Sequence, residues 1–131
     1  MGFGIKTAFD ARFVSGFELV STWLGLEEKI LKTDVVLSGE GRFDASSLDG
    51  KGPALLLEKA HRHGKTVFLV AGSIQDDICP VLKDRIPGLK TFSVSRPGLP
   101  LSENLKRSRE FFEQTLRKIV QDEGWPLLQA R

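Results

Sequence analysis

The stretch Thr66–Ala71, which reads TVFLVA, determines the fold class of this 131-residue chain. Every residue after the threonine is apolar, which is typical of a strand that is covered on both faces. Gly72 and Ser73 follow at once and indicate a turn. A strand buried on both faces is typical of a parallel sheet, whose strands are usually connected by helices.

Helical patterns flank this strand on both sides. The segment from Pro53 to His63 predicts a helix, because its leucines supply an apolar face and Pro53 suits the first helical position. Gly64 fits the C-terminal stop of that helix. A shorter helix is expected from about Asp76 to Lys83.

Two further runs predict the remaining strands of the sheet. Residues 35–37 (VVL) precede a turn signal at residues 38–41, and residues 90–94 (KTFSV) precede another at residues 95–98. The resulting order predicts a three-layer α/β arrangement, a small parallel sheet with helices on both faces and right-handed crossovers. Three strands are fewer than usual, so we expect part of a larger domain.

Both ends of the chain carry helical patterns as well. Ser15 and Glu18 form a capping-box pattern, and Gly25 should interrupt the helix before residues 26–31 add another turn or two. Trp23 and the phenylalanines are expected in the core. Ser102 is expected to cap a last helix that ends near Gly124. Its apolar face would comprise Leu105, Phe112, Leu116, Ile119 and Val120.

Composition excludes several classes of protein. Apolar residues make up 40% and charged residues 27% of the chain, which argues against disorder, and the net charge of +2 predicts neither nucleic-acid nor membrane binding. The single Cys79 excludes an internal disulfide framework and a cysteine-rich zinc site. Neither a membrane-length apolar run nor a signal-peptide pattern is present, so a cytoplasmic setting is expected.

Polar and charged residues are concentrated in the loop from Ser38 to Gly52. Ligands of open parallel sheets sit beyond the carboxyl ends of the strands, and this loop and those at residues 72–76 and 95–99 all follow such ends. Arg42 could hold a carboxylate or a phosphate, and Lys51 could act as a point charge on phosphate. Asp44 or Glu40 could bind Mg²⁺ or accept a proton.

These groups suit phosphoryl transfer, which depends mostly on positioning and charge stabilisation. The alternative is a solvated loop with a surface Arg–Asp pair, and the loop is neither a Walker A nor a Rossmann motif. Other candidates favour structural roles: a helix cap at Ser73 and Asp76, a turn at Ser95 and Arg96, helix-end charges at His61 and His63, and an idle thiol at Cys79.

The loop and its surroundings resemble the bacterial glycerate kinase family that phosphorylates D-glycerate with ATP. Residues 34–44 (DVVLSGEGRFD) resemble its segment D-[LV]-V-[IL]-[TS]-G-E-G-R-x-D. Residues 46–53 look like its G-K-x-P stretch, residues 65–73 its strand ending in A-G-S, and residues 15–20 its G-[IF]-E-L-V helix start. The final helix, around Glu103, is also similar. The resemblance covers residues 1–131 as a single α/β unit.

Family proteins are longer, and this chain resembles only their C-terminal part. The resemblance implies that MgATP gives its γ-phosphoryl group to glycerate, forming a phosphoglycerate and ADP. It implies Arg42 on substrate carboxylate or phosphate, Asp44 as base or Mg²⁺ ligand, Glu40 as a supporting carboxylate and Lys51 as a neutralising charge. Ligand-binding roles are expected for Gly39, Gly41, Ser46, Gly72 and Ser73.

A chain truncated to this part is expected to have little or no kinase activity alone, because orientation supplies much of the rate. An exposed sheet edge would also favour self-association. The alternative interpretation is a non-catalytic α/β binding module or a decayed kinase remnant. The expected ligands are glycerate and ATP with Mg²⁺, with no nucleic-acid or membrane partner.

Overall fold

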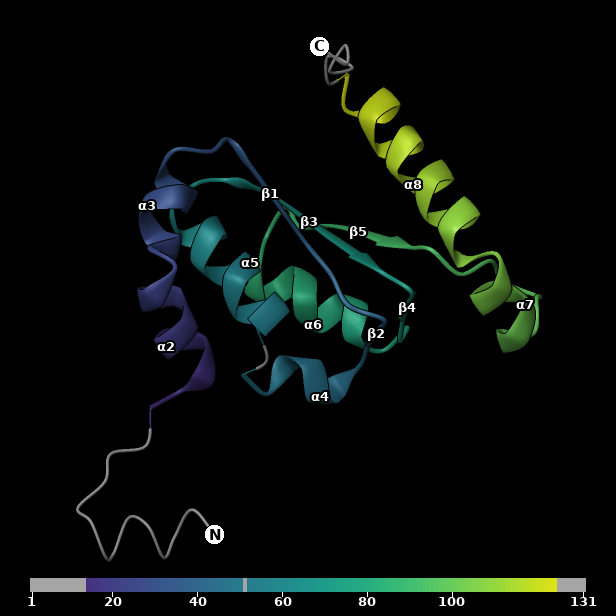
Figure 1. Cartoon of the computed structure of the whole chain (residues 1–131), viewed down its shortest axis with the longest axis horizontal. Helices are drawn as coiled ribbons and strands as arrows, with labels where there is room; N and C mark the ends of the chain where they lie inside the picture. Colours follow the sequence, from purple (N-terminus) through teal and green to yellow (C-terminus); the bar gives the residue numbers. More distant parts are fainter. Residues whose placement is uncertain (1–13, 51, 125–131) are drawn as a thin grey trace, which may run out of the picture.

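Three parallel strands form the centre of the structure, a computed structural model that describes residues 14–50 and 52–124. They are β1 (Val35–Ser38), β3 (Thr66–Ala71) and β5 (Lys90–Ser93), and β3 lies between the other two (Figure 1). In register, Val35 faces Thr66 and Phe68 faces Lys90. The small parallel sheet predicted from the sequence is thereby confirmed.

A second pair of short parallel strands continues beyond this sheet. β2 (Arg42–Phe43) pairs with β4 (Ser73–Ile74), and α4 (Ala45–Leu48) follows β2 directly. The sequence predicted only loops here. Two-residue strands show no measurable periodicity, and they form because their backbone groups find partners in the neighbouring segment.

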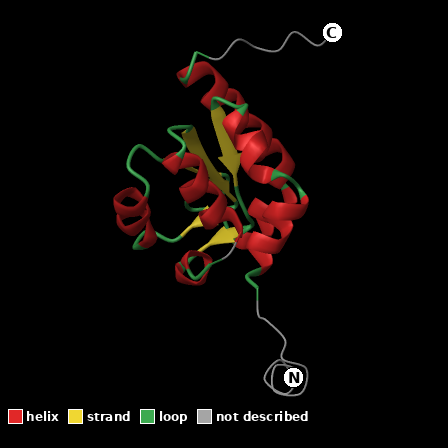
Figure 2. Cartoon of the chain, turned by 90° about the vertical axis from the view of Figure 1, so that its left-hand side faces the viewer, coloured by secondary structure: helices red, strands yellow, loops and turns green. Residues whose placement is uncertain are grey.

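Helices cover both faces of the sheet, as predicted (Figure 2). Along one face lie α5 (Gly52–Arg62) and α6 (Ile78–Arg85), and on the other lies α8 (Ser108–Asp122). The side chains of β3 alternate between these layers: Val67, Leu69 and Ala71 pack with α5 and α6, whereas Phe68 and Val70 pack with α8. This alternation divides the core in two.

The first core layer is the larger one. Its fully buried side chains include Phe43 from β2, Leu57 from α5 and Leu82 from α6. Phe43 is the anchor that fixes the polar loop to the protein, because its ring is completely buried while the residues beside it stay exposed or half-buried.

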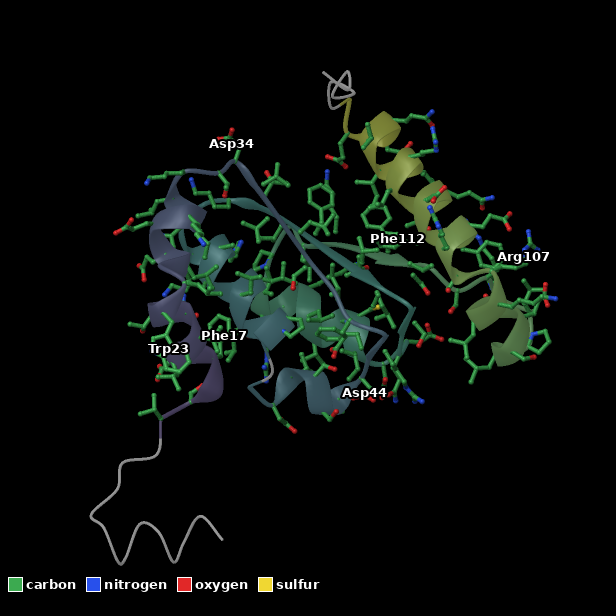
Figure 3. All side chains as sticks on the ribbon, viewed as in Figure 1. Phe17, Trp23, Asp34, Asp44, Arg107 and Phe112 are labelled. Carbon is green, nitrogen blue, oxygen red and sulfur yellow. The ribbon has the colours of Figure 1, made fainter. Side chains whose placement is uncertain are left out.

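The two N-terminal helices begin and end where the sequence predicted. The predicted capping bond from the Ser15 side chain and the predicted burial of Trp23 are wrong. α2 (Gly16–Trp23) and α3 (Leu26–Leu31) are separated at Gly25, whose φ is 56°. The Ser15 side chain makes no capping bond; α2 starts there through the Leu19 N–H, which donates to the Ser15 carbonyl oxygen at 3.0 Å. Trp23 is 74% exposed and points away from the sheet (Figure 3).

The single C-terminal helix predicted from the sequence is in fact two helices. α7 (Leu101–Lys106) follows Pro100, which takes the N-cap position expected for Ser102, and the chain breaks at Arg107 before α8. Leu105 on α7 and Phe112 on α8 are exposed rather than buried, which corrects the predicted apolar face at these two positions.

The buried residues of α8 are Phe111, Thr115 and Ile119, and Leu116 packs partly buried beside them, so the predicted face is confirmed at Ile119 and in part at Leu116. Thr115 is polar, and its hydroxyl is satisfied by donating to the Phe111 carbonyl oxygen at 2.8 Å. Among residues 14–50 and 52–124, no helix combines the length and apolar character needed to cross a bilayer.

Candidate functional site

Backbone hydrogen bonds bring the ends of the three strands together. The Gly72 N–H donates to the Glu40 carbonyl oxygen at 3.0 Å, and the Ser73 N–H donates to that of Gly41 at 3.1 Å. On the other side, the Ser95 N–H donates to the Gly72 carbonyl oxygen at 2.8 Å. The loops that begin at residues 38, 72 and 95 therefore meet at one end of the sheet, as the parallel-sheet rule predicts.

Two glycines permit this close approach. A Cβ atom on Gly39 would lie 1.8 Å from the Val70 carbonyl oxygen, and one on Gly72 would lie 2.2 Å from that of Gly41. Gly41 itself has open space around its Cα. Gly39 and Gly72 are thus required for backbone packing, whether or not they also approach a ligand.

Arg42 and Asp44 lie beside each other after the turn. The Arg42 Nε is 3.6 Å from the Asp44 Oδ2, and the two side chains are 71% and 30% exposed. An ion pair this exposed contributes little to stability. Arg42 also stands opposite Ser73 in the β2–β4 pair, so the guanidinium and the Gly72-Ser73 turn share one edge.

The Asp44 carboxylate also forms the N-terminal cap of α4 (Figure 3). Its Oδ1 accepts from the Ser46 N–H at 3.0 Å and from the Ser46 hydroxyl at 2.7 Å. In return, the buried Ser47 Oγ accepts from the Asp44 N–H at 3.3 Å. Capping fixes the rotamer of Asp44, so its carboxylate has a defined position at this edge.

Glu40 differs from these residues because one of its carboxylate oxygens is buried. The Oε1 atom has no hydrogen-bond partner within the described part of the chain. Glu40 lines a cleft of about 520 Å³ that otherwise has mainly apolar walls, including Leu37, Val70, Val94 and Phe112. A buried carboxylate oxygen without a donor is costly, so this atom indicates a missing donor or cation.

The described residues contain no group of three or more acidic, histidine or cysteine side chains arranged to hold a metal ion. Mg²⁺ commonly needs only one or two protein carboxylates together with substrate phosphates and water. Of the two candidate carboxylates, that of Asp44 is 30% exposed, whereas one oxygen of Glu40 is buried. Lys51 was predicted to supply positive charge here and lies outside the described residues.

The third loop is held by a residue that the sequence analysis did not single out. Asn104 is buried; its Oδ1 accepts from the Arg96 N–H at 2.8 Å, and its Nδ2 donates to the carbonyl oxygens of Arg96 and Leu99 at 3.2 and 3.1 Å. The Arg96 guanidinium contacts α8, donating to Gln114 at 3.1 Å and lying over the Phe111 ring.

Two further candidates from the sequence are Ser73, which lies in a strand, and His63, which contacts a glutamate. Ser73 belongs to β4 and does not cap α6, which begins at Ile78. His63 Nε2 lies 3.1 Å from Glu27 Oε1, and Lys59 Nζ lies 2.6 Å from Glu27 Oε2. The hydrogen bond from Lys59 and its positive charge lower the pKa of Glu27.

Comparison with known proteins adds an independent finding. The model of the glycerate kinase family matches residues 1–122. An uncharacterized protein of Synechocystis sp. is 31% identical over 122 residues, which cover 92% of this chain and 32% of that protein. Glycerate 2-kinase of Escherichia coli is 40% identical over 78 residues, covering 60% and 20% of the two chains. Glycerate kinase of Bacillus subtilis is 29% identical over 120 residues, covering 92% and 31%. The chain spans about a third, or less, of these relatives' length.

Proposed function

Because the chain belongs to the glycerate kinase family, we propose that it supplies one wall of a site for phosphoryl transfer from ATP to glycerate. The observation that supports this is the meeting of the three strand ends, where backbone bonds join the Glu40-to-Asp44 segment to the Gly72-Ser73 turn. That segment supplies a guanidinium and two carboxylates, and Arg42 and Asp44 lie beside each other. Such a set is suited to a reaction governed by positioning and charge.

In the proposed reaction, a hydroxyl oxygen of glycerate forms a bond to the γ-phosphorus as the bond from that phosphorus to the β–γ bridging oxygen breaks. The products are a phosphoglycerate and ADP, and the hydroxyl proton passes to a carboxylate. We assign the 2-hydroxyl as acceptor; a relative is named Glycerate 2-kinase.

Each side chain has a proposed task. Arg42 binds the glycerate carboxylate or a phosphate, which its exposure permits. Asp44, with its rotamer fixed by capping, accepts the proton or faces the metal. Mg²⁺, when bound with ATP, would neutralise phosphate charge beside Asp44 and Glu40. Lys51 is proposed to add positive charge on the strength of the resemblance alone.

We further propose that this chain has no turnover alone. The described site is a single open end of the sheet, and about two thirds of the relatives' length lies outside the part that the chain matches. The opposing wall that would orient ATP against glycerate is expected from that remainder. Without it, the contribution of orientation to the rate is lost.

The test is a coupled ADP-release assay with D-glycerate and MgATP. We define the complementary fragment as the part of Bacillus subtilis glycerate kinase outside the stretch that this chain matches. The chain alone should be inactive, and the chain co-expressed with the complementary fragment should release ADP only when glycerate is present. Assembly confirmed by sedimentation but without turnover would contradict the proposed function.

Two variants make the assay specific. Asp44→Asn keeps a good N-cap residue while removing the charge, so it should retain the fold and lower turnover by about 100-fold or more. Arg42→Ala should lower turnover mainly at limiting glycerate. Lys83→Ala, an exposed change on α6, is the control and should have no effect.

A further inference from the structure

A second arginine, Arg96, lies at the end of the sheet that carries the candidate site. It belongs to the loop that follows β5, the third of the strands whose ends meet there. Figure 1 shows β2, β4 and the start of α8 at this same end of the structure. Arg96 is therefore on one of the loops that can contact a ligand beyond the strand ends.

Arg42 and Arg96 flank the turn at Gly72 and Ser73 from opposite sides. Arg42 pairs with Ser73 through β2 and β4, whereas the N–H of Ser95, the residue before Arg96, donates to the Gly72 carbonyl oxygen. One chain segment lies between the two, and two strand spacings amount to about 10 Å. At that separation, the two arginines suit two different anionic groups better than a single shared one.

Both arginines lie on the same face of the sheet. Phe43 packs in the core layer of α5 and α6, so the alternation of side chains along β2 directs Arg42 to the opposite face. Arg96 contacts Phe111 of α8, the helix that covers this opposite face. A ligand on the α8 side of the strand ends could therefore meet both guanidiniums.

Two separate sets of contacts hold Arg96 in place. Its backbone N–H and carbonyl oxygen bond to the Asn104 side chain at 2.8 and 3.2 Å. Its guanidinium lies over the Phe111 ring, 5.2 Å from the ring centroid, and its Nη2 donates to the Gln114 Oε1 at 3.1 Å. A guanidinium carries five N–H donors in a rigid plane, so further donors of Arg96 remain in a defined orientation.

The side-chain partner of Arg96 is neutral, which distinguishes it from the other arginines nearby. Those form ion pairs with carboxylates: Arg42 with Asp44, Arg107 with Glu110, and Arg109 with Glu113. Glu110 also attracts Arg96 but accepts its hydrogen bonds from Arg107 and Gln114. Within the described part of the chain, no carboxylate lies at ion-pair distance from Arg96, so its positive charge is available to an anion.

We propose that Arg96 binds a phosphate of the nucleoside triphosphate and that Arg42 binds the glycerate carboxylate. This inference rests on the proposed function and divides its two anions between the two arginines. The reason for this order is Asp44, which lies beside Arg42 and is the proposed proton acceptor. The 2-hydroxyl of glycerate is on the carbon next to the carboxylate, so a carboxylate held by Arg42 brings that hydroxyl toward Asp44. The triphosphate is then left to Arg96, whose planar fork matches phosphate oxygens.

The experiment measures binding to the full chain and does not require turnover. Inorganic tripolyphosphate, which represents the triphosphate without the nucleoside, is titrated into the chain in magnesium-free buffer and followed by calorimetry. Saturable binding is expected, and Arg96→Gln should weaken it by at least about tenfold, as expected for the loss of charge-assisted hydrogen bonds. Arg42→Gln should weaken it less. Absence of saturable binding, or a larger effect of Arg42→Gln than of Arg96→Gln, overturns the proposal.

Two further variants separate a phosphate contact from a structural role and from general charge. Arg96→Lys loses the stacking plane but keeps the charge, and Asn104 still holds the backbone of this position, so it should bind tripolyphosphate at least about threefold more tightly than Arg96→Gln. Arg117→Gln removes the same charge from an exposed site on α8. Arg117 is about 14 Å along the helix from its first residue, beyond the screening length of about 8 Å at 0.15 M salt, so affinity should change by less than about twofold. Equal affinities of Arg96→Lys and Arg96→Gln, or equal effects of Arg96→Gln and Arg117→Gln, overturn the proposal.

Failure of this inference is distinguishable from failure of the proposed function. If tripolyphosphate binding requires Arg96 but the assembly with the complementary fragment has no turnover, the phosphate site is supported and the proposed function is contradicted. If that assembly releases ADP and tripolyphosphate binding is unchanged in Arg96→Gln, the role of Arg96 alone is overturned.

Discussion

At the scale of single residues, two glycines determine whether the candidate site can form. Gly39 lies against the Val70 carbonyl oxygen and Gly72 against that of Gly41, each too close for a Cβ atom. Both contacts are with backbone, which cannot move aside as a flexible side chain can. The course of the polar loop therefore depends on the absence of side chains at these two positions.

Gly39→Ala should reduce the free energy of unfolding by at least about 2 kcal/mol, because the new methyl group overlaps the Val70 carbonyl oxygen. Urea titration followed by circular dichroism measures this change. Gly41→Ala is the matched control in the same loop, since its Cβ atom would meet no atom within 4 Å. Equal stability of the two variants would contradict the packing role of Gly39.

At the scale of elements, Asn104 at α7 holds the loop after β5. Its side chain makes three hydrogen bonds to the backbone of Arg96 and Leu99 and is only 8% exposed. This loop closes the third strand end of the candidate site. A single side chain therefore holds this loop in position, although the loop belongs to no helix or strand.

Asn104→Ala should lower the free energy of unfolding by about 2 to 3 kcal/mol, because it leaves backbone groups of the loop without partners. Asn104→Asp keeps the acceptor for the Arg96 N–H but sets a carboxylate oxygen against the carbonyl oxygens of Arg96 and Leu99, so its loss at neutral pH should be at least as large. Both are measured by urea unfolding. An Asn104→Ala chain as stable as the original would show that water replaces these bonds without cost.

Glu27 links α3 to α5 through Lys59, which holds the pKa of Glu27 below its ordinary value of 4.5. A carboxyl whose folded pKa is lowered stabilises the fold above its unfolded pKa, and this contribution is lost as pH falls through the folded value. The stability difference between the original chain and Glu27→Gln should therefore be present near pH 7 and decline as the pH falls below 4.5 and through the lowered pKa of Glu27. Urea titrations across this range measure it, with Glu28→Gln as the control. A difference independent of pH would contradict the ion-pair explanation.

The sequence predicts best those helices and strands whose apolar pattern extends over many residues. The apolar run of β3 and the leucine-rich face of α5 were sufficient to predict the parallel sheet and, through it, the edge where the loops meet. The break at Arg107 lacks a glycine or proline signal, so one helix was predicted where two exist. Burial of Glu40 Oε1 and of Asn104 depends on tertiary packing and has no local signal.

At the scale of the whole molecule, burial is unevenly distributed among the helices and strands. β3 pairs on both sides and lies between the two core layers, whereas α2 exposes Leu19, Val20, Trp23 and Leu24. Figure 1 shows α2 at the margin of the structure, beside α3. The chain should therefore open at α2 before it opens at the centre.

Amide hydrogen exchange measured by mass spectrometry should show this order. Peptides covering Thr66–Ala71 should exchange most slowly, at rates set by global unfolding, and those covering Gly16–Trp23 should exchange faster by at least about tenfold. Peptides of α5, a helix of similar length that packs on the sheet, are the control and should resemble β3. Equal protection of α2 and β3 would show that the molecule unfolds as one unit.

The path of the segment from Glu40 to Phe43 is secured by main-chain amides of β4 and its flanking residues, together with one buried phenylalanine. None of these restraints involves the side chains at positions 40 and 42. A combinatorial library randomised at those two positions should consequently yield variants that share one loop geometry while differing in charge and size. Selection from such a library would report the chemical preferences of a ligand separately from the tolerance of the scaffold.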